Sequence, residues 1–179
     1  MGQEHAASLK GNPLCRLLSD AETAEIAFLM ESRSVRARHE LYQDGDPSDG
    51  LYLVVSGEFE MVKKGAQRER ELARLGPGTI LGAISLLTRD VRVVTARARV
   101  DSSVLLLPAQ QFQALVRAGS PAALKLVAGI AEVVAQRLAS TNAKLIELAD
   151  KVEAAESTPA KERDHQFLEL QHALQAWSF

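Results

Sequence analysis

Apolar and polar positions alternate differently in three stretches of the chain. Between about residues 12 and 32, apolar residues recur at helical spacings, and Ser19-Asp20 provides a cap for a helix. From about 33 to 107 the apolar segments are short and rich in valine and leucine, with glycine turns such as Gly76-Pro77-Gly78 between them. From Pro108 onward the helical spacing returns. The pattern predicts helices on both sides of a β-rich middle region.

The middle region has the pattern of an antiparallel β-sandwich or barrel, because its strands are short and closely spaced. The segment Leu51-Tyr-Leu-Val-Val55 is apolar on both alternating faces, which predicts a strand that is buried on both sides. The predicted fold class is therefore α+β. We divide the chain into an N-terminal helical segment (1–32), a barrel with a short helix (33–119), a long helix (120–157) and a C-terminal tail (158–179).

The long helix carries a seven-residue repeat. Counting in sevens gives two series: Leu124, Ala131, Leu138, Leu145 and Val152, and Val127, Val134, Thr141, Leu148 and Ala155. Nine of these ten positions are apolar, which indicates a coiled-coil seam and hence a parallel homodimer. The alternative is a single amphipathic helix packed on its own barrel.

The C-terminal tail reads as a short amphipathic helix that follows a break at Pro159. Its apolar residues lie on one face: Phe167, Leu170, Leu174 and Trp177. A helix of this length is not stable alone, so it must dock on something. Two alternatives stay open: the tail folds back on its own dimer, or it binds another protein.

The segment from Gly82 to Arg92 contains the candidate chemistry. A glycine at the start of a short helix leaves backbone N–H groups that can bind an anion. The next strand is predicted to begin near Arg92 and to turn one alternating set inward, namely Val94, Ala96, Ala98 and Val100, with Thr95, Arg97 and Arg99 facing solvent. Arg92 shares the inward parity, and an inward guanidinium needs a negative partner such as a bound phosphate. Alternatively, Arg92 lies at the strand end and pairs with Asp90 or with solvent.

The glycines and apolar residues of the barrel also occur in the order that is typical of a known family. The matching segments are Gly45-Asp-Pro-Ser-Asp-Gly-Leu-Tyr-Leu-Val-Val-Ser-Gly57, Leu75-Gly-Pro-Gly-Thr-Ile-Leu-Gly82, Ser85-Leu-Leu87 and Arg92. Over roughly residues 12–150 the chain resembles the cyclic nucleotide-binding domain of Crp/Fnr-type regulators, kinase regulatory subunits and gated channels. The resemblance implies an eight-stranded jelly roll (a double-stranded β-helix), a phosphate-binding cassette and a long helix that closes over the ligand.

The cassette of the family can be carried over residue by residue. Gly82 matches the cassette glycine, and Arg92 matches the arginine that binds the phosphate. Ala83, Ile84 and Ser85 then offer backbone N–H groups to that phosphate. The resemblance thus implies cAMP, cGMP or another phosphate-bearing small molecule as the ligand, with no further cofactor.

Two residues depart from the family pattern. Ala83 stands where the family has a glutamate that accepts the ribose 2′-hydroxyl, and Val93 stands where many members have a hydroxyl side chain that binds the phosphate. Loss of one charged hydrogen bond costs about 1.5–3 kcal/mol, which is about 10- to 150-fold in affinity. We therefore expect weak binding of cyclic nucleotides, or a different ligand.

A further match lies on the long helix. Thr141-Asn142 stands where the family's catabolite activator carries a Thr-Ser pair that reads the adenine base across the dimer. This implies a contact of Thr141 and Asn142 with the ligand. Thr141 is also the one polar residue of the heptad seam, and a lone polar seam residue often sets the register of a coiled coil instead.

Composition and charge restrict the class of protein. The chain has 179 residues, 46% of them hydrophobic and 25% charged, and a net charge of −2, which argues against a general affinity for nucleic acid or anionic membranes. Cys15 is the single cysteine, so an internal disulfide and a cysteine-based metal site are ruled out, and we expect a cytoplasmic protein. No apolar run approaches the roughly 20 residues of a membrane span, and the N-terminus does not look like a signal peptide.

Catalysis and direct DNA binding find no support in the sequence. The four histidines, His5, His39, His165 and His172, have no visible nucleophile or base partner, so we expect neither an enzyme nor a metal site. The family's DNA-binding members carry a helix-turn-helix domain of roughly 70 residues after the long helix. Only about 20 residues follow Pro159 here, so we expect no direct DNA binding.

Two functions remain open from the sequence. The first is a sensor, in which an anionic nucleotide binds at Gly82–Arg92, shifts the long helix and signals to a partner protein. The second is a dimerisation or interaction scaffold that keeps the barrel and has lost nucleotide binding. Arg92 favours the sensor, whereas Ala83 and Val93 favour the scaffold.

Overall fold

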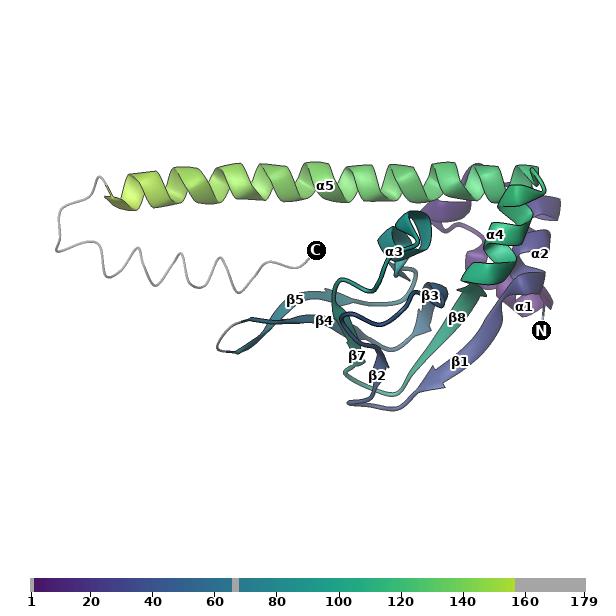
Figure 1. Ribbon diagram of the computed structural model, residues 1–179, viewed down its shortest axis with the longest axis horizontal. Coiled ribbons are helices and arrows are strands. Elements are labelled where there is room, and N and C mark those ends of the chain that lie inside the picture. The colour runs from purple at the N-terminus through teal and green to yellow at the C-terminus, as the bar shows by residue number, and fades with distance from the viewer. Residues whose placement is uncertain (1, 66–67, 157–179) are drawn as a thin grey trace. The chain divides into compact units, whose positions relative to one another are not determined.

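The computed structural model describes residues 2–65 and 68–156 and is shown in Figure 1. The chain divides into two compact units, residues 1–134 and residues 135–179, and the division falls within the helix α5 (Pro121–Glu156). The predicted tail, 158–179, lies outside the described residues, and the four-part division proposed from the sequence stays a prediction.

Three helical elements precede the barrel: α1 (Gly2–Leu9), the 3-10 helix η1 (Pro13–Cys15) and α2 (Asp20–Leu29). The cap predicted for α2 is present. The Ser19 hydroxyl accepts the backbone N–H of Glu22, and the Glu22 carboxylate accepts the backbone N–H of Ser19. This reciprocal capping satisfies two N–H groups that the first turn of a helix leaves unpaired.

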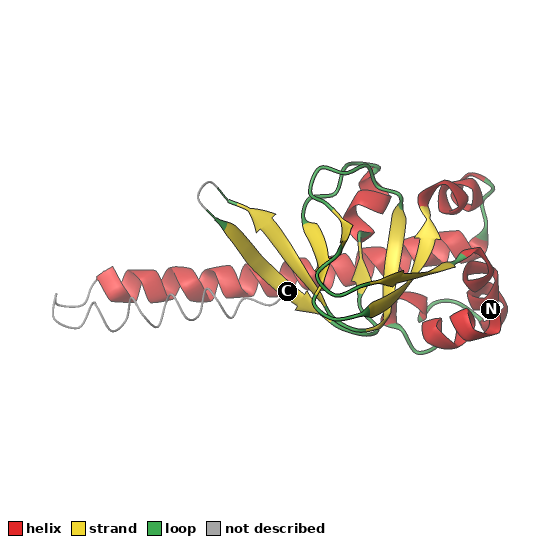
Figure 2. Cartoon of the chain, turned by 90° about the horizontal axis from the view of Figure 1, so that it is seen from below, coloured by secondary structure: helices red, strands yellow, loops and turns green. Residues whose placement is uncertain are grey.

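The barrel consists of two antiparallel sheets of four strands each, whose strands are yellow in Figure 2. In hydrogen-bonded order the first sheet contains β1 (Glu31–Val35), β8 (Ser102–Pro108), β3 (Gly50–Ser56) and β6 (Ile80–Leu81). The second contains β2 (Glu40–Tyr42), β7 (Thr95–Ala98), β4 (Phe59–Lys64) and β5 (Glu69–Leu75). The jelly-roll fold and the α+β class are therefore confirmed.

Strand β3 is buried on both faces from Gly50 to Val54, as its two-sided apolar pattern predicted, but Val55, the last residue of that pattern, is exposed. Tyr52 and Val54 pack in the core between the two sheets. Leu51 and Leu53 belong to a second core, which the helices share with the outer face of the first sheet. The first sheet is thus the central layer of the unit, because successive side chains of a strand point to opposite faces.

Three helices follow or interrupt the strands: α3 (Ala83–Thr88), α4 (Ala109–Arg117) and α5. In the first unit, α5 buries one face in the second core, through Ala122, Ala123, Leu126 and Ile130. None of these four residues belongs to the heptad series. Among the described residues no single helix is long and apolar enough to cross a membrane, and only α4 and α5 taken together across their bend satisfy that test.

The heptad positions of α5 are mostly outside the core. In the first unit Leu124 is exposed, whereas Val127 and Val134 pack partly against the second core. In the second unit Leu138, Leu145 and Val152 are exposed. The helix therefore uses one face for its own core and leaves much of the predicted seam open.

Gly129 of α5 provides a test of the second core. A Cβ atom at this position would overlap the backbone carbonyl oxygen of Leu14 in η1. We expect Gly129→Ala to lower the free energy of unfolding by about 1–3 kcal/mol, the usual cost of overpacking. Thermal or chemical denaturation measures this change.

Whether Gly129→Ala lowers or raises the free energy of unfolding shows whether α5 lies as close to η1 as the structure has it. Gly-to-Ala in a helix interior otherwise stabilises by about 1 kcal/mol, because alanine has the higher helix propensity. A more stable Gly129→Ala variant would therefore contradict the close approach of α5 to η1.

Candidate functional site

Arg92 lies in the segment between α3 and β7, with its side chain 1% exposed. Its backbone is tied to the loop between β2 and β3. The Arg92 N–H donates to the Asp46 carbonyl at 2.8 Å, and the Gly45 N–H donates to the Arg92 carbonyl at 2.8 Å. These two hydrogen bonds hold the arginine at the point where the loop, the short helix α3 and the strand β7 converge.

The guanidinium of Arg92 is bound on two sides by groups of the protein. Its Nη2 donates to Asp49 Oδ1 at 2.6 Å and to the Gly50 carbonyl at 2.7 Å. Its Nη1 donates to Ser85 Oγ at 3.0 Å and to the Gly82 carbonyl at 3.4 Å. The inward placement agrees with the sequence prediction, and the negative partner is the Asp49 carboxylate, neither Asp90 nor solvent.

Two aromatic rings complete the surroundings of this guanidinium. The Arg92 Cζ atom lies 4.3 Å from the ring centroid of Tyr42 and 5.5 Å from that of Tyr52, so both rings contribute cation–π attraction. The Arg92 Nε atom is buried and has no hydrogen-bond partner within the described part of the chain. The positive charge of Arg92 is thus compensated, but one of its five N–H donors, the one on Nε, has no hydrogen-bond partner within the described residues.

Asp49 is the exposed half of this ion pair, with a side chain 44% exposed. Burial acts to raise the pKa of the Asp49 carboxyl, but hydrogen bonds from the Tyr52 hydroxyl and from Arg92, with the charges of Arg92 and Arg33, outweigh it and hold that pKa below its ordinary value. The Tyr52 hydroxyl in turn has a raised pKa, because of burial and its bond to Asp49. Asp49 is therefore an anion at neutral pH, held between two arginines and a tyrosine.

Gly82 makes the close approach of Arg92 to α3 possible. It caps α3 with φ +76°, in the left-handed region that favours glycine, and a Cβ atom there would overlap Nη1 of Arg92. No side chain caps this helix end. The first backbone N–H groups of α3, those of Ala83, Ile84 and Ser85, precede the start of intrahelical hydrogen bonding and point away from the helix.

The other residues predicted around the cassette differ in exposure. Ala83 and Ser85 are buried, whereas Ile84 and Val93 are exposed. Lys63 of β4 fixes the backbone at Val93, because its Nζ donates to the Val93 carbonyl at 2.7 Å. The structure thus brings Gly82, Ser85 and Arg92 into direct contact, whereas the Val93 side chain lies outside that group.

The predicted strand from Arg92 needs two corrections. The strand β7 covers only Thr95–Ala98, so Arg92 precedes it and Val100 follows it. Val100, predicted to face inward, is exposed, and Thr95, predicted to face solvent, is buried. The buried Thr95 hydroxyl accepts the backbone N–H of Asp44 at 3.0 Å, which offsets the cost of burying it.

Thr141 and Asn142 belong to the second compact unit. The Thr141 hydroxyl donates to the Arg137 carbonyl one turn earlier, and the Asn142 side chain is exposed. Their contact with a ligand stays a prediction.

Sequence reasoning missed three residues of this site: Asp49, Tyr42 and Tyr52. Asp49 and Tyr52 lie inside the quoted segment Gly45–Gly57, and an aspartate directly before a doubly buried strand was the available signal. Their roles depend on contacts with Arg92 across 43 and 40 positions, which no local spacing reveals.

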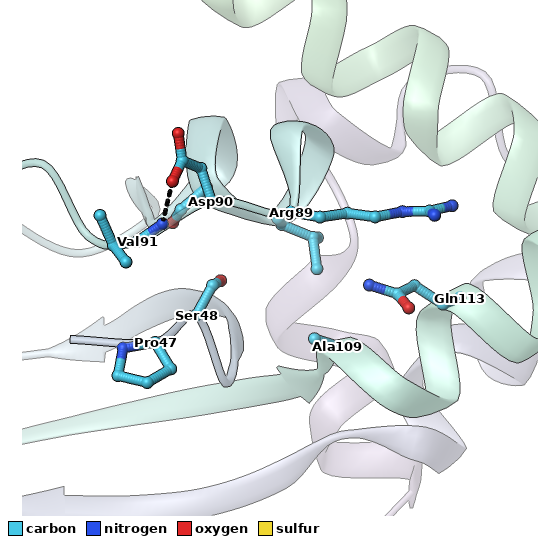
Figure 3. Close-up of a pocket in the computed structure, with 9 residues that line it drawn as sticks. Pro47, Ser48, Arg89, Asp90, Val91, Ala109 and Gln113 are labelled. Atoms are coloured by element: carbon cyan, nitrogen blue, oxygen red, sulfur yellow. Dashed lines mark hydrogen bonds between the residues drawn. The ribbon is translucent and has the colours of Figure 1, made fainter. Parts of the chain in front are cut away.

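A cavity of about 260 Å³ lies next to this cluster (Figure 3). Its walls come from the β2–β3 loop, α3 and the residues after it, and α4: Pro47, Ser48, Ser85, Leu86, Arg89, Asp90, Val91, Ala109 and Gln113. Ser85 is shared between the cavity and the Arg92 cluster. Among the described residues, no group of three metal-ligating side chains could hold a metal ion.

Comparisons with known proteins agree on one family. Residues 32–118 match the family described as the cyclic nucleotide-binding domain. The cyclic AMP receptor protein of Thermus thermophilus is 34% identical over 140 residues, which are 76% of this chain and 62% of that protein. The chain thus spans less than two thirds of the length of this relative.

Solved structures give the same result. The N-terminal domain of a transcriptional regulator from Streptomyces coelicolor A3(2) is 29% identical, with a TM-score of 0.64 over 77% of this chain and 94% of that one. A cyclic nucleotide-binding domain from Methylobacillus flagellatus superposes with a TM-score of 0.73 over 82% of this chain and 84% of that one. At 17% identity, the second likeness concerns the fold alone.

Arg92 is buried and Asp49 is half-exposed, so replacing one or the other should lower the stability of the protein by different amounts. Asp49→Asn leaves a buried cation without its anion, whereas Arg92→Met leaves an anion that water can reach. We expect Asp49→Asn to lower the free energy of unfolding by about 1.5–3 kcal/mol, and Arg92→Met to lower it by less. Urea denaturation of the two variants measures the difference.

The double variant Asp49→Asn/Arg92→Met serves as the control. It should recover part of the stability lost in Asp49→Asn, because the unpaired buried charge is gone. Equal losses in the two single variants that simply add in the double variant would show that the ion pair does not hold Arg92.

Proposed function

Because the chain belongs to the cyclic nucleotide-binding domain family, we propose that it is a sensor module that binds a cyclic nucleotide or a related phosphate ligand at Arg92. The observation that carries this proposal is the buried guanidinium of Arg92 in contact with the glycine that begins α3. A fixed cation beside unpaired backbone N–H groups suits an anion.

In the proposed mechanism the ligand phosphate replaces Asp49 as the counter-ion of Arg92. A cyclic phosphodiester and a carboxylate each carry one negative charge, so the guanidinium remains compensated throughout the exchange. Asp49 is half-exposed and can turn to water, where its hydration offsets the lost bond. The exchange also releases the Asp49 side chain, directly before β3, from the segment at Arg92. This release is the change that the module would transmit to a partner protein through α5.

The apolar side chains around the site restrict the ligand. Neither Ala83 nor Val93 can accept or donate a hydrogen bond through its side chain, so a ribose hydroxyl would be buried without that partner. We therefore propose that cAMP and cGMP bind weakly, and that another phosphate-bearing molecule without this requirement binds more tightly. The T. thermophilus relative is named as a cyclic AMP receptor, which supports the general class of ligand.

A second candidate function is a scaffold that binds no nucleotide. The observation that favours it is the complete use of Nη1 and Nη2 of Arg92 by Asp49, Gly50, Ser85 and Gly82. In this case Arg92 has a structural role, holding the β2–β3 loop to α3, and the module acts through its helix alone.

The exposed stripe on α5 supports a homodimer in either case. Leu138 and Leu145 lie one heptad apart, and both are more than half exposed. The Thermus relative matches this chain over 140 residues, which are 76% of this chain. We propose that a second copy covers this stripe in a cytoplasmic dimer.

A thermal-shift panel tests the sensor. We expect at least one of a set of cyclic mono- and dinucleotides to raise the melting temperature of the wild type, since a ligand at 100 times its Kd adds about 2.7 kcal/mol. Arg92→Lys should lose this shift, because an ammonium cannot reproduce the forked contacts of the guanidinium.

Arg99→Lys is the matched control. Arg99 forms a surface ion pair with Glu58, so its replacement should leave the ligand shift unchanged. If no nucleotide shifts the wild type, or if Arg92→Lys responds like the wild type, the scaffold is the function that remains.

The dimer is tested on the second unit of the chain. We expect Leu138→Asp/Leu145→Asp to convert the dimer to a monomer in light scattering at micromolar concentration, because the charges fall in the centre of the apolar seam. Ile146→Asp is the control, since Ile146 is 64% exposed but lies outside both heptad series. A wild-type monomer, or an equal effect of the control, would contradict the seam.

A further inference from the structure

The cavity in Figure 3 has the features of a binding site that is separate from Arg92. Its lining combines apolar side chains, those of Leu86, Pro47 and Ala109, with polar groups from three different elements. Such a mixture is typical of sites for small organic molecules. Its volume of about 260 Å³ lies below the usual range of about 300–1,000 Å³ for drug-sized ligands, so its ligand is small.

Ser48 shows that the cavity contains unused hydrogen-bonding capacity. Its Oγ atom is buried and has no hydrogen-bond partner within the described part of the chain. A buried hydroxyl without a partner is unfavourable, and the Ser48 side chain points into the cavity (Figure 3). A ligand acceptor inside the cavity would satisfy it.

Arg89 supplies a positive charge at the same place. It forms no ion pair with any described residue, and its side chain extends toward Gln113 of α4 (Figure 3). Asp90 turns the other way and accepts the backbone N–H of Val91 at 2.8 Å. Arg89 also has φ +59°, in the left-handed region that favours glycine. The end of α3 therefore holds an arginine in a backbone conformation in which glycine would be less strained.

We propose that this cavity binds a small organic carboxylate, with its charged group at Arg89 and its apolar body on Leu86 and Ala109. The Ser48 hydroxyl and the Gln113 amide donate to the same carboxylate or to a neighbouring acceptor. Because the proposal uses no contact of Arg92, it stands independently of the proposed nucleotide site.

The bound carboxylate would also act on the Arg92 cluster. Ser85 forms part of the cavity wall, and its hydroxyl accepts Nη1 of Arg92 at 3.0 Å. Ser48 directly precedes Asp49, the counter-ion of Arg92. A ligand that orders Ser48 and Ser85 would therefore affect the ion pair between Arg92 and Asp49 through directly neighbouring groups.

Benzoate is the probe for the test, and benzamide is its uncharged counterpart. We expect saturable binding of benzoate to the full chain in ligand-observed NMR, and much weaker binding of benzamide. Arg89→Gln should weaken benzoate binding at least tenfold, the loss that follows from removing a charged hydrogen bond. Ala109→Leu should also abolish binding, because it fills the cavity without changing any charge.

Arg117→Gln is the matched control, because Arg117 is an exposed arginine of α4 that lies outside the cavity wall. Its benzoate affinity should equal that of the wild type, whereas Arg92→Lys should retain benzoate binding even if it loses nucleotides. Absence of saturable benzoate binding, equal binding of benzamide, or equal losses in Arg89→Gln and Arg117→Gln would each overturn the site.

Ser48→Ala gives a second readout that does not depend on affinity. Removing an unpaired buried hydroxyl should raise the melting temperature of the protein without benzoate and reduce the shift that benzoate produces. A lower melting temperature of Ser48→Ala would show that the hydroxyl is already paired, and would overturn its role as a free donor.

Discussion

The contact on which the barrel's functional end depends is the salt bridge between Arg92 and Asp49. Burying a guanidinium is costly without an anion beside it, and Arg92, which is 1% exposed, has the half-exposed Asp49 as that anion. The carbonyls of Gly50 and Gly82 and the hydroxyl of Ser85 accept the other hydrogen bonds from Nη1 and Nη2 of Arg92. The β2–β3 loop, the start of β3 and α3 are thus joined through one side chain, and a ligand that replaced Asp49 would remove one of these contacts.

The central layer of the unit explains why this end of the barrel is well placed to transmit a change. Strand β3 begins at Gly50, directly after Asp49, and its side chains alternate between the two cores. Leu51 and Leu53 contact the core that also contains Leu126 and Ile130 of α5. A displacement at Asp49 therefore meets, within four residues, side chains that pack in the same cluster as the long helix.

The fold could be read largely from the sequence, whereas the site could be read only in part. The two-sided apolar pattern of Leu51–Val55 and the cap at Ser19 are local signals, and the structure shows both, except that Val55 is exposed. The inward direction of Arg92 was predicted from strand parity, although Arg92 precedes β7 and is held by the turn at Gly45 and Asp46 instead. Asp49 as its counter-ion, and the cavity beside Ser85, arise from tertiary contacts between segments about 40 residues apart, and sequence spacing carries no information about such contacts.

The burial of β3 on both faces also affects how the chain folds during its synthesis. Its partner β8 pairs Leu51 with Leu107 and Leu53 with Leu105, so the central strand must wait for more than 50 further residues to leave the ribosome. During that time the edge of β3 that β8 covers stays open, although β6 can already pair with the other edge at Tyr52 and Leu53. An apolar strand with an open edge is the type of segment that aggregates most readily. Chaperone demand during synthesis should therefore concentrate on this strand, and it should decrease sharply once Pro108 has emerged and β8 can close the sheet.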